Sequence, residues 1–239
     1  MVCNTGAGLT PRVDDEVRLF NEQGLYNGLF LMADDKTGTY WNHMTGEAVY
    51  GPEVGKRLEV HNVRHTTVAQ ILIEDPETRV ALSEHRRAQR GRGPLSAILS
   101  GFQRLSRMFL NTIDEQDERR PTMDLGLGIW DGSTQRYYAH ETIMAQNKAV
   151  LDSFGGRTIL VYYEPVGFSP MAHYVDASSF WWVDDVLHLS SGEYIEDGVT
   201  HAADGSRVDV ERPLQVFTRW YGFSQTFPET ELYGEEPAR

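Results

Sequence analysis

A chain of 239 residues with 40% hydrophobic residues is long enough for two compact units and can bury a core. Its formal net charge of −13 argues against nucleic-acid binding, because phosphate contacts need an excess of lysine and arginine. The single cysteine excludes an internal disulfide and an all-cysteine metal site, and no apolar run approaches the ~20 residues that a membrane span requires.

The chain begins close to a cysteine-containing turn, without the strand that normally precedes such a turn. Cys3 is followed by a glycine-spaced turn at Gly6 and Gly8, yet only two residues precede it where a strand is expected. No signal peptide comes before this turn. We therefore expect the first unit to be N-terminally incomplete, and the compartment of the protein stays undetermined.

Residues 27–52 predict three short antiparallel strands joined by two glycine turns. Carboxylates precede a glycine in 34–38, and a second glycine turn follows at Gly46. The strand between these turns is rich in aromatic and β-branched residues. Because side chains alternate across a strand, Trp41 and His43 are expected on one face. The alternative is a sheet face with an ordinary packed tryptophan.

The first unit, residues 1–84, is predicted to close with a short helix and a strand. Residues 66–73 predict the helix, and a threonine is available as its N-terminal cap. Pro76-Glu77-Thr78 then leads into the predicted strand, residues 79–82.

Residues 85–122 predict a linker that begins with a basic, glycine-interrupted stretch. Within it, residues 94–110 carry leucine, isoleucine and phenylalanine at helical spacing, and Pro94 suits a first helical turn. We expect this helix to pack its apolar stripe on a sheet.

The second unit, residues 123–234, is again predicted as strands, turns and short helices, and residues 235–239 form a tail. Asp131-Gly132 is a strong hairpin signal. Residues 140–154 predict a helix closed by Gly155-Gly156. The predicted strands are 125–130, 136–138, 158–163, 186–189, 194–195 and 208–210.

A short pattern occurs in both units. Residues 66–83 contain a predicted helix, then Pro-Glu-Thr, then a predicted strand, and residues 220–234 contain the same order around Pro228-Glu229-Thr230. We therefore predict an α+β protein, mainly antiparallel β, built from two related sheet-rich units with a few helices. The first unit would lack its opening strands and helix.

The sequence resembles a bacterial and archaeal family called DUF3179. TGTYWNHMTGEAVYGPEVGKRLE resembles its tryptophan-containing hairpin and is the most specific match. YYAHETIMAQNKAVLDSFGGRTILVYY resembles its hairpin, helix and strand, and MVCNTGAG resembles the second half of its Cys-x-x-Cys turn. The resemblance implies no settled activity. This chain departs from the pattern, because it holds only Cys3 where two cysteines are usual and none in the equivalent turn of the second unit, residues 163–168.

The candidate site centres on Cys3, with Trp41 and His43 beside it and His65 or His61 as further candidates. A thiolate with one or two imidazoles suits copper or zinc, and without metal such a thiol supports redox or nucleophilic chemistry. We therefore assign Cys3 a catalytic or metal-binding role, Trp41 a cofactor-binding role, and His43 and His65 metal-ligand roles. His61 and His65 have the i,i+4 spacing of a helix, although the residues between them look extended.

Two other functional classes stay open. The first is a non-catalytic structural or interaction module, in which the same residues are structural. The adjacent Trp181 and Trp182 cannot share one face of a strand, so we expect one in the core and one exposed at a sugar- or partner-binding patch. The second, a hydrolase, requires an acid or nucleophile pair that is not found in the sequence.

Overall fold

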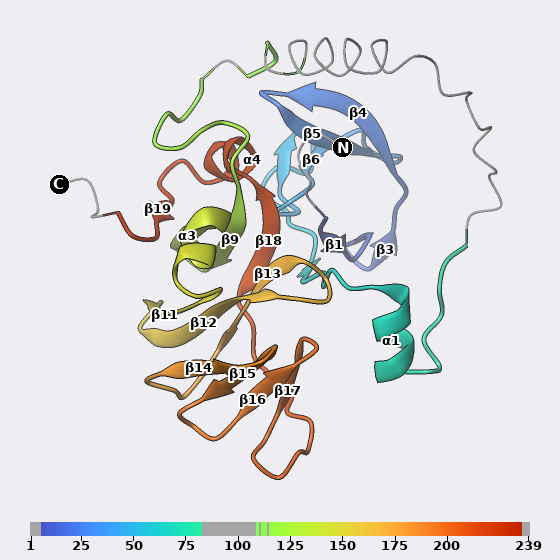
Figure 1. Ribbon diagram of the computed structural model, residues 1–239. Helices are drawn as coiled ribbons and strands as arrows, with labels where there is room; N and C mark the ends of the chain where they lie inside the picture. Colours follow the sequence, from blue (N-terminus) through green and yellow to red (C-terminus); the bar gives the residue numbers. More distant parts are fainter. Residues whose placement is uncertain (1–5, 83–108, 110, 114, 236–239) are drawn as a thin grey trace, which may run out of the picture.

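The computed structural model describes residues 6–82, 109, 111–113 and 115–235, and antiparallel sheets dominate it (Figure 1). The prediction of a mainly antiparallel α+β fold is confirmed. The predicted linker helix over 94–110 lies, except for Phe109, outside the described residues. The helices in the described part are short: α1 (Val68–Glu74), α3 (His140–Ala145) and α4 (Trp220–Thr226).

A four-stranded meander forms most of the first part of the chain. Its strands, in spatial order, are β4 (Phe20–Tyr26), β5 (Leu29–Asp34), β6 (Tyr40–Asn42) and β7 (Ala48–Tyr50). Two smaller ladders accompany the meander: β1 (Gly8–Leu9) pairs with β8 (Val60–His61), and β2 (Arg12–Val13) pairs with β3 (Glu16–Val17).

The turn between β5 and β6 forms as its sequence predicts. The Asp34 carboxylate accepts hydrogen bonds from the backbone amides of Lys36 and Thr37, at 3.0 and 2.7 Å. Gly38 then adopts φ = +68°, a conformation that costs glycine little. Side-chain chemistry and a glycine thus fix this hairpin locally.

The second part contains a mixed four-stranded sheet. Its strands, in spatial order, are β18 (Leu214–Arg219), β9 (Leu125–Asp131), β10 (Thr134–Ala139) and β19 (Glu231–Leu232). The last strand joins β10 in parallel, whereas the other pairings are antiparallel. Gly128 allows close packing here, because a Cβ at this position would lie 2.2 Å from the ring of Phe223 on α4.

The first strand of a three-stranded sheet replaces the end of a predicted helix. Its strands are β11 (Ala149–Phe154), β12 (Arg157–Glu164) and β13 (Ser169–Tyr174). The prediction of one helix over 140–154 is wrong after Ala145, because Asn147 and Lys148 adopt φ of 57° and 62° and end it. Gly155 and Gly156, also at positive φ, form the two-residue turn between β11 and β12.

A second meander, which forms the lower end of the molecule in Figure 1, contains the tryptophan pair. Its strands are β14 (Phe180–Val183), β15 (Val186–Leu189), β16 (Tyr194–Glu196) and β17 (Val199–His201). Trp181 is half exposed and stacks on His188, whereas Trp182 packs against the core and donates to the Asn147 carbonyl. The predicted split of the two tryptophans is confirmed. The predicted strand over 208–210 does not form.

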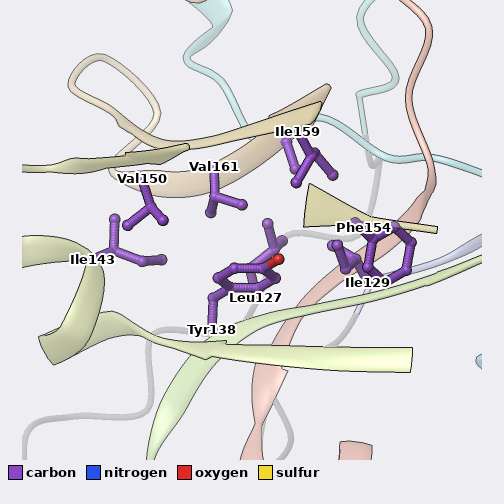
Figure 2. Packing of buried hydrophobic residues seen from close by; sticks show 9 residues of the cluster. Leu127, Ile129, Tyr138, Ile143, Val150, Phe154, Ile159 and Val161 are labelled. Carbon is purple, nitrogen blue, oxygen red and sulfur yellow. The ribbon is translucent and has the colours of Figure 1, made fainter. Parts of the chain in front are cut away.

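A hydrophobic cluster of nine buried residues lies between the mixed sheet, the three-stranded sheet and α3. Figure 2 shows these side chains converging from β9, β10, α3, β11 and β12. Full burial of one such leucine, isoleucine or valine contributes ~1.5–3 kcal/mol, so this cluster is a main source of stability. Its buried members are Leu127, Ile129, Tyr138, Ile143, Val150, Phe154, Ile159, Val161 and Ala172.

The two parts of the chain pack against each other. Met44, in the turn after β6, is buried in one cluster with Trp220 and Phe223 of α4. The side chain of Asn62 also donates a hydrogen bond to the Pro213 carbonyl and accepts one from the backbone N–H of Gln215, both at 2.9 Å. The hairpin of the first part is therefore held directly on the second part.

The two segments with the Pro-Glu-Thr pattern agree only in part. A seven-residue helix precedes the pattern in both, namely α1 and α4. The predicted strand over 79–82 is absent, whereas β19 follows the second copy. The helix α1 begins at Val68, two residues after the predicted start, with the threonine Thr67 as its N-cap. It is largely exposed, but α4 is buried. The two-unit division at 1–84, 85–122 and 123–234 and the internal repeat stay predictions.

Candidate functional site

Trp41 is a core residue of the first part. Its side chain is 0% exposed and packs in one cluster with Val13, Ala48 and Leu58. Its indole N–H donates a hydrogen bond of 3.1 Å to Oδ2 of Asp34. A ligand therefore has no exposed face of this ring to stack on, and the geometry agrees with the packed-tryptophan alternative.

Asp34 links the tryptophan to a buried arginine. Arg18 contacts Asp34 at 3.3 Å and Glu53 at 3.0 Å. Burial alone raises the pKa of Asp34, but hydrogen bonds from the Thr37 amide and the Trp41 indole outweigh it and hold the pKa well below its usual range. Lys56 forms a further ion pair with Glu53, so each carboxylate of this network has a basic partner within the first part, and its role is structural.

His43 lies in the turn after β6 and no longer on the strand. Its Nδ1 is 2.9 Å from the carbonyl oxygen of Phe30, and its ring packs edge-on against the Phe30 ring. Because a carbonyl only accepts, Nδ1 carries the proton and Nε2 is the free lone pair. Burial lowers the pKa of His43, so the ring is neutral at pH 7, and its buried Nε2 has no hydrogen-bond partner among the described residues.

His65 lies near Gly6 of the N-terminal turn, whereas His61 pairs with Gly8 across β1 and β8. A Cβ built on Gly6 would be 3.8 Å from Nε2 of His65, whose ring packs edge-on against Phe217 of β18. His61, at the end of β8, instead places Nε2 2.6 Å from the Thr10 hydroxyl. β8 ends at His61 and residues 62–65 are not helical, so the helical i,i+4 geometry is absent, as the extended pattern predicts. Cys3 itself lies outside the described residues.

A cavity of about 120 Å³ opens beside His65, at the junction of the two parts. The segment 62–65 forms one wall, and the start of β13 and the residues in and before β18 form the others. Its polar lining comes from Asn62, Arg64, His65, Ser169, Arg212 and Gln215.

Most of these polar groups already have partners. Arg64 donates to both carboxylate oxygens of Glu74 on α1, at 2.7 and 2.5 Å. The side-chain amide of Gln215 accepts a hydrogen bond from the backbone N–H of Ala172 at 2.7 Å and donates one to the Ala172 carbonyl at 2.9 Å. Arg212 makes a long contact, 3.4 Å from Nη1 to the carbonyl oxygen of Ala172, and its guanidinium also interacts with the side chain of Tyr162. Its guanidinium is thus the least committed charged group of the cavity.

Two buried rings lie near this guanidinium. Tyr162 and His173 are about 1% exposed, and their ring centroids are 5.6 Å apart in an edge-on contact. Burial, and then the positive charge of Arg212, lower the pKa of His173 to about 3. Burial raises the pKa of Tyr162, and Arg212 opposes that shift. Both rings are therefore neutral at pH 7, and within the part of the chain that the structure describes neither nitrogen of His173 has a hydrogen-bond partner.

A family model described as "Protein of unknown function (DUF3179)" matches residues 1–230. The chain belongs to the DUF3179 family. The predicted resemblance is confirmed, and the match spans both parts of the chain, including the tryptophan hairpin and the junction cavity. Comparisons with curated proteins and with solved structures found no match.

Within the described residues of this DUF3179 protein, no group of three or more histidine, cysteine, aspartate or glutamate side chains is arranged to hold a metal ion. A metal site at the N-terminal turn would therefore need Cys3 as one of its ligands. No helix in the described part of the chain is both long and apolar enough to cross a membrane.

Sequence reasoning on this DUF3179 chain found His65 but missed the rest of the cavity. Ser169 and His173 on β13, Tyr162 on β12, and Arg212 belong to no recognisable motif. They meet because β12 pairs with β13 and because Gln215 of β18 is bonded to Ala172 of β13. Only long-range strand pairing brings these positions together, and no local pattern signals it.

Proposed function

We propose that this protein carries a metal-binding or thiol-redox centre at its N-terminal turn, with Cys3 and His65 as its principal residues. The observation that supports this choice is that Gly6 lies beside His65: a Cβ added to Gly6 would be 3.8 Å from Nε2 of the imidazole. Gly6 is only three residues beyond Cys3, so a thiol near this imidazole needs no rearrangement of the described chain.

In this proposal Trp41 and His43 support the hairpin rather than the centre. The indole of Trp41 is committed to Asp34, and Nδ1 of His43 is committed to Phe30. His65, by contrast, is half buried and lines a cavity. It can therefore reach a ligand that enters from solvent.

The chemistry follows from the two donor types. A thiolate and an imidazole are the ligands that zinc and copper take in proteins. Two protein ligands would leave coordination positions for a further small ligand, and the junction cavity offers space for one. Without a metal, an adjacent imidazole lowers the pKa of a thiol and makes it a better nucleophile or redox group.

Metal titration of the full chain and its variants tests the proposal. We expect the wild type to bind one equivalent of Zn²⁺ or Cu⁺, and the Cys3→Ser and His65→Ala variants to bind at least tenfold more weakly. His61→Ala and His43→Ala are matched controls and should bind like the wild type. Equal binding by wild type and His65→Ala, or binding by none of the forms, would contradict a metal centre.

The second candidate is a non-catalytic interaction module. It is favoured by apolar side chains that the meander exposes on β4 and β7: Tyr26 is 69% and Tyr50 is 71% exposed. Such surface groups often mark a protein interface. This candidate predicts no metal in any form and no effect of His65→Ala on the reactivity of Cys3.

A further inference from the structure

We propose that the junction cavity beside His65 binds a small oxyanion, a carboxylate or inorganic phosphate, with Arg212 as its charge partner. The inference is independent of Cys3 and of any metal, because it rests only on described residues of the second part and on segment 62–65.

The size of the cavity restricts the ligand. A volume of about 120 Å³ is smaller than the ~150 Å³ cavity that accommodates benzene, and far below the ~300–1,000 Å³ of sites for drug-sized molecules. A nucleotide or a sugar ring is therefore too large. Acetate, formate and phosphate have five or fewer non-hydrogen atoms and fit.

The charge of the cavity favours an anion. Arg64 is neutralised by its bidentate contact with Glu74. No carboxylate of the described residues forms an ion pair with Arg212, whose partners are the Ala172 carbonyl, at a long 3.4 Å, and the neutral Tyr162 side chain. A planar guanidinium with free donors matches the two oxygens of a carboxylate or phosphate.

The nearby carboxylate of Glu164 does not take the place of a ligand. It is fully buried, and its two oxygens accept hydrogen bonds from the backbone amides of Val166 and Gly167. These amides stabilise the negative charge of Glu164 within its own turn. The positive charge of Arg212 therefore stays available to the cavity.

A hydroxyl without a partner supplies the second donor. Ser169 lines the cavity, is 2% exposed, and its Oγ is buried with no hydrogen-bond partner among the described residues. Buried polar groups are rarely left in this state. Rotation about χ1 turns a serine hydroxyl between three staggered positions, so Ser169 can donate to an oxyanion held by Arg212.

The surroundings of Arg212, beyond the lining of the cavity, support this interaction. Tyr162 and His173, buried near Arg212, are neutral at pH 7, and so add no competing charge. Charge-assisted hydrogen bonds gain strength where water is displaced and the local dielectric is low. The segment 62–65 is only partly buried and forms the side open to solvent.

Thermal denaturation of the metal-free full chain tests the inference. Sodium acetate and sodium phosphate are compared with sodium chloride at equal ionic strength. We expect one of the two oxyanions to raise Tm by about 5 °C at 100 times its Kd, since a ligand of the folded state stabilises it. Which of them does so decides between a carboxylate and a phosphate ligand.

Variants then assign the effect to the cavity. Arg212→Gln should raise the Kd at least tenfold, and Ser169→Ala, which removes only a hydroxyl, should raise it severalfold. Arg57→Gln, a change at an exposed arginine paired with Glu47, is the matched control. Cys3→Ser should bind the anion like the wild type, so failure of the proposed metal centre leaves this result unaffected.

Two outcomes would overturn the inference. One is a wild-type Tm that responds to acetate and phosphate no more than to chloride. The other is an anion response that Ser169→Ala and Arg212→Gln both leave at the wild-type size, which would place the anion elsewhere on the surface. If Arg212→Gln does not fold, the Kd of Ser169→Ala alone decides.

Discussion

The Asp34 carboxylate holds the first hairpin together at the scale of a single residue. It accepts hydrogen bonds from the backbone amides of the turn and from the indole of Trp41, and it forms an ion pair with Arg18. The Trp-containing hairpin that carries the family resemblance is thus built around this buried acid. Its sequence signal is turn chemistry, and its physical role is structural.

Asp34→Asn should therefore destabilise the folded state by about 2 kcal/mol at pH 7, because it removes the charge from several charge-assisted hydrogen bonds. The folded pKa of Asp34 is depressed, so its stabilisation is complete above the unfolded pKa of ~3.9 and is lost as pH falls through the folded pKa. Urea unfolding should show the difference from wild type shrinking below about pH 4. Asp35→Asn, next to it, should change stability by less than ~0.5 kcal/mol. A pH-independent difference would refute this assignment.

At the scale of elements, local signals predicted the turns better than the strands. Asp131-Gly132 and the turn at Gly38 carry their own conformational preference, and both formed. The predicted helix over 140–154 was wrong in its second half because Ala149–Phe154 pairs with β12, which no local pattern reveals. The predicted strands at 79–82 and 208–210 did not form. Beside the second, the pairing with β17 consists of one bridge, Arg207 to His201, and one hydrogen bond from the Val208 amide to the Thr200 carbonyl.

Gly128 of β9 sets how closely α4 approaches the mixed sheet. Gly128→Ala should cost about 1–3 kcal/mol, because its Cβ would overlap the buried ring of Phe223. Denaturant unfolding of Gly128→Ala, Phe223→Leu and the double variant measures the coupling. The double variant should be more stable than the sum of the two single losses predicts. Simple additivity would show that the ring does not limit the substitution.

At the scale of the whole molecule, the two parts of the chain meet at a shared core and at the junction cavity. Met44 of the hairpin packs with α4, and segment 62–65 faces β13 and β18. The histidine pattern led to His65, whereas Arg212 and Ser169, more than a hundred residues away in sequence, were not predictable. A site between distant segments arises from the fold, so composition and spacing alone cannot reveal it.

The central claim is that Cys3 and His65 are neighbours, and the pH dependence of thiol alkylation tests it most directly. Cys3 is the single cysteine of the chain, so the rate reports one thiol. In the metal-free wild type we expect the midpoint of the rate profile to lie about one pH unit or more below 8.5, the ordinary thiol pKa, because an adjacent imidazolium stabilises the thiolate.

The His65→Ala variant should return that midpoint to about 8.5, and His61→Ala should keep the wild-type profile. Identical profiles for wild type and His65→Ala would contradict the claim.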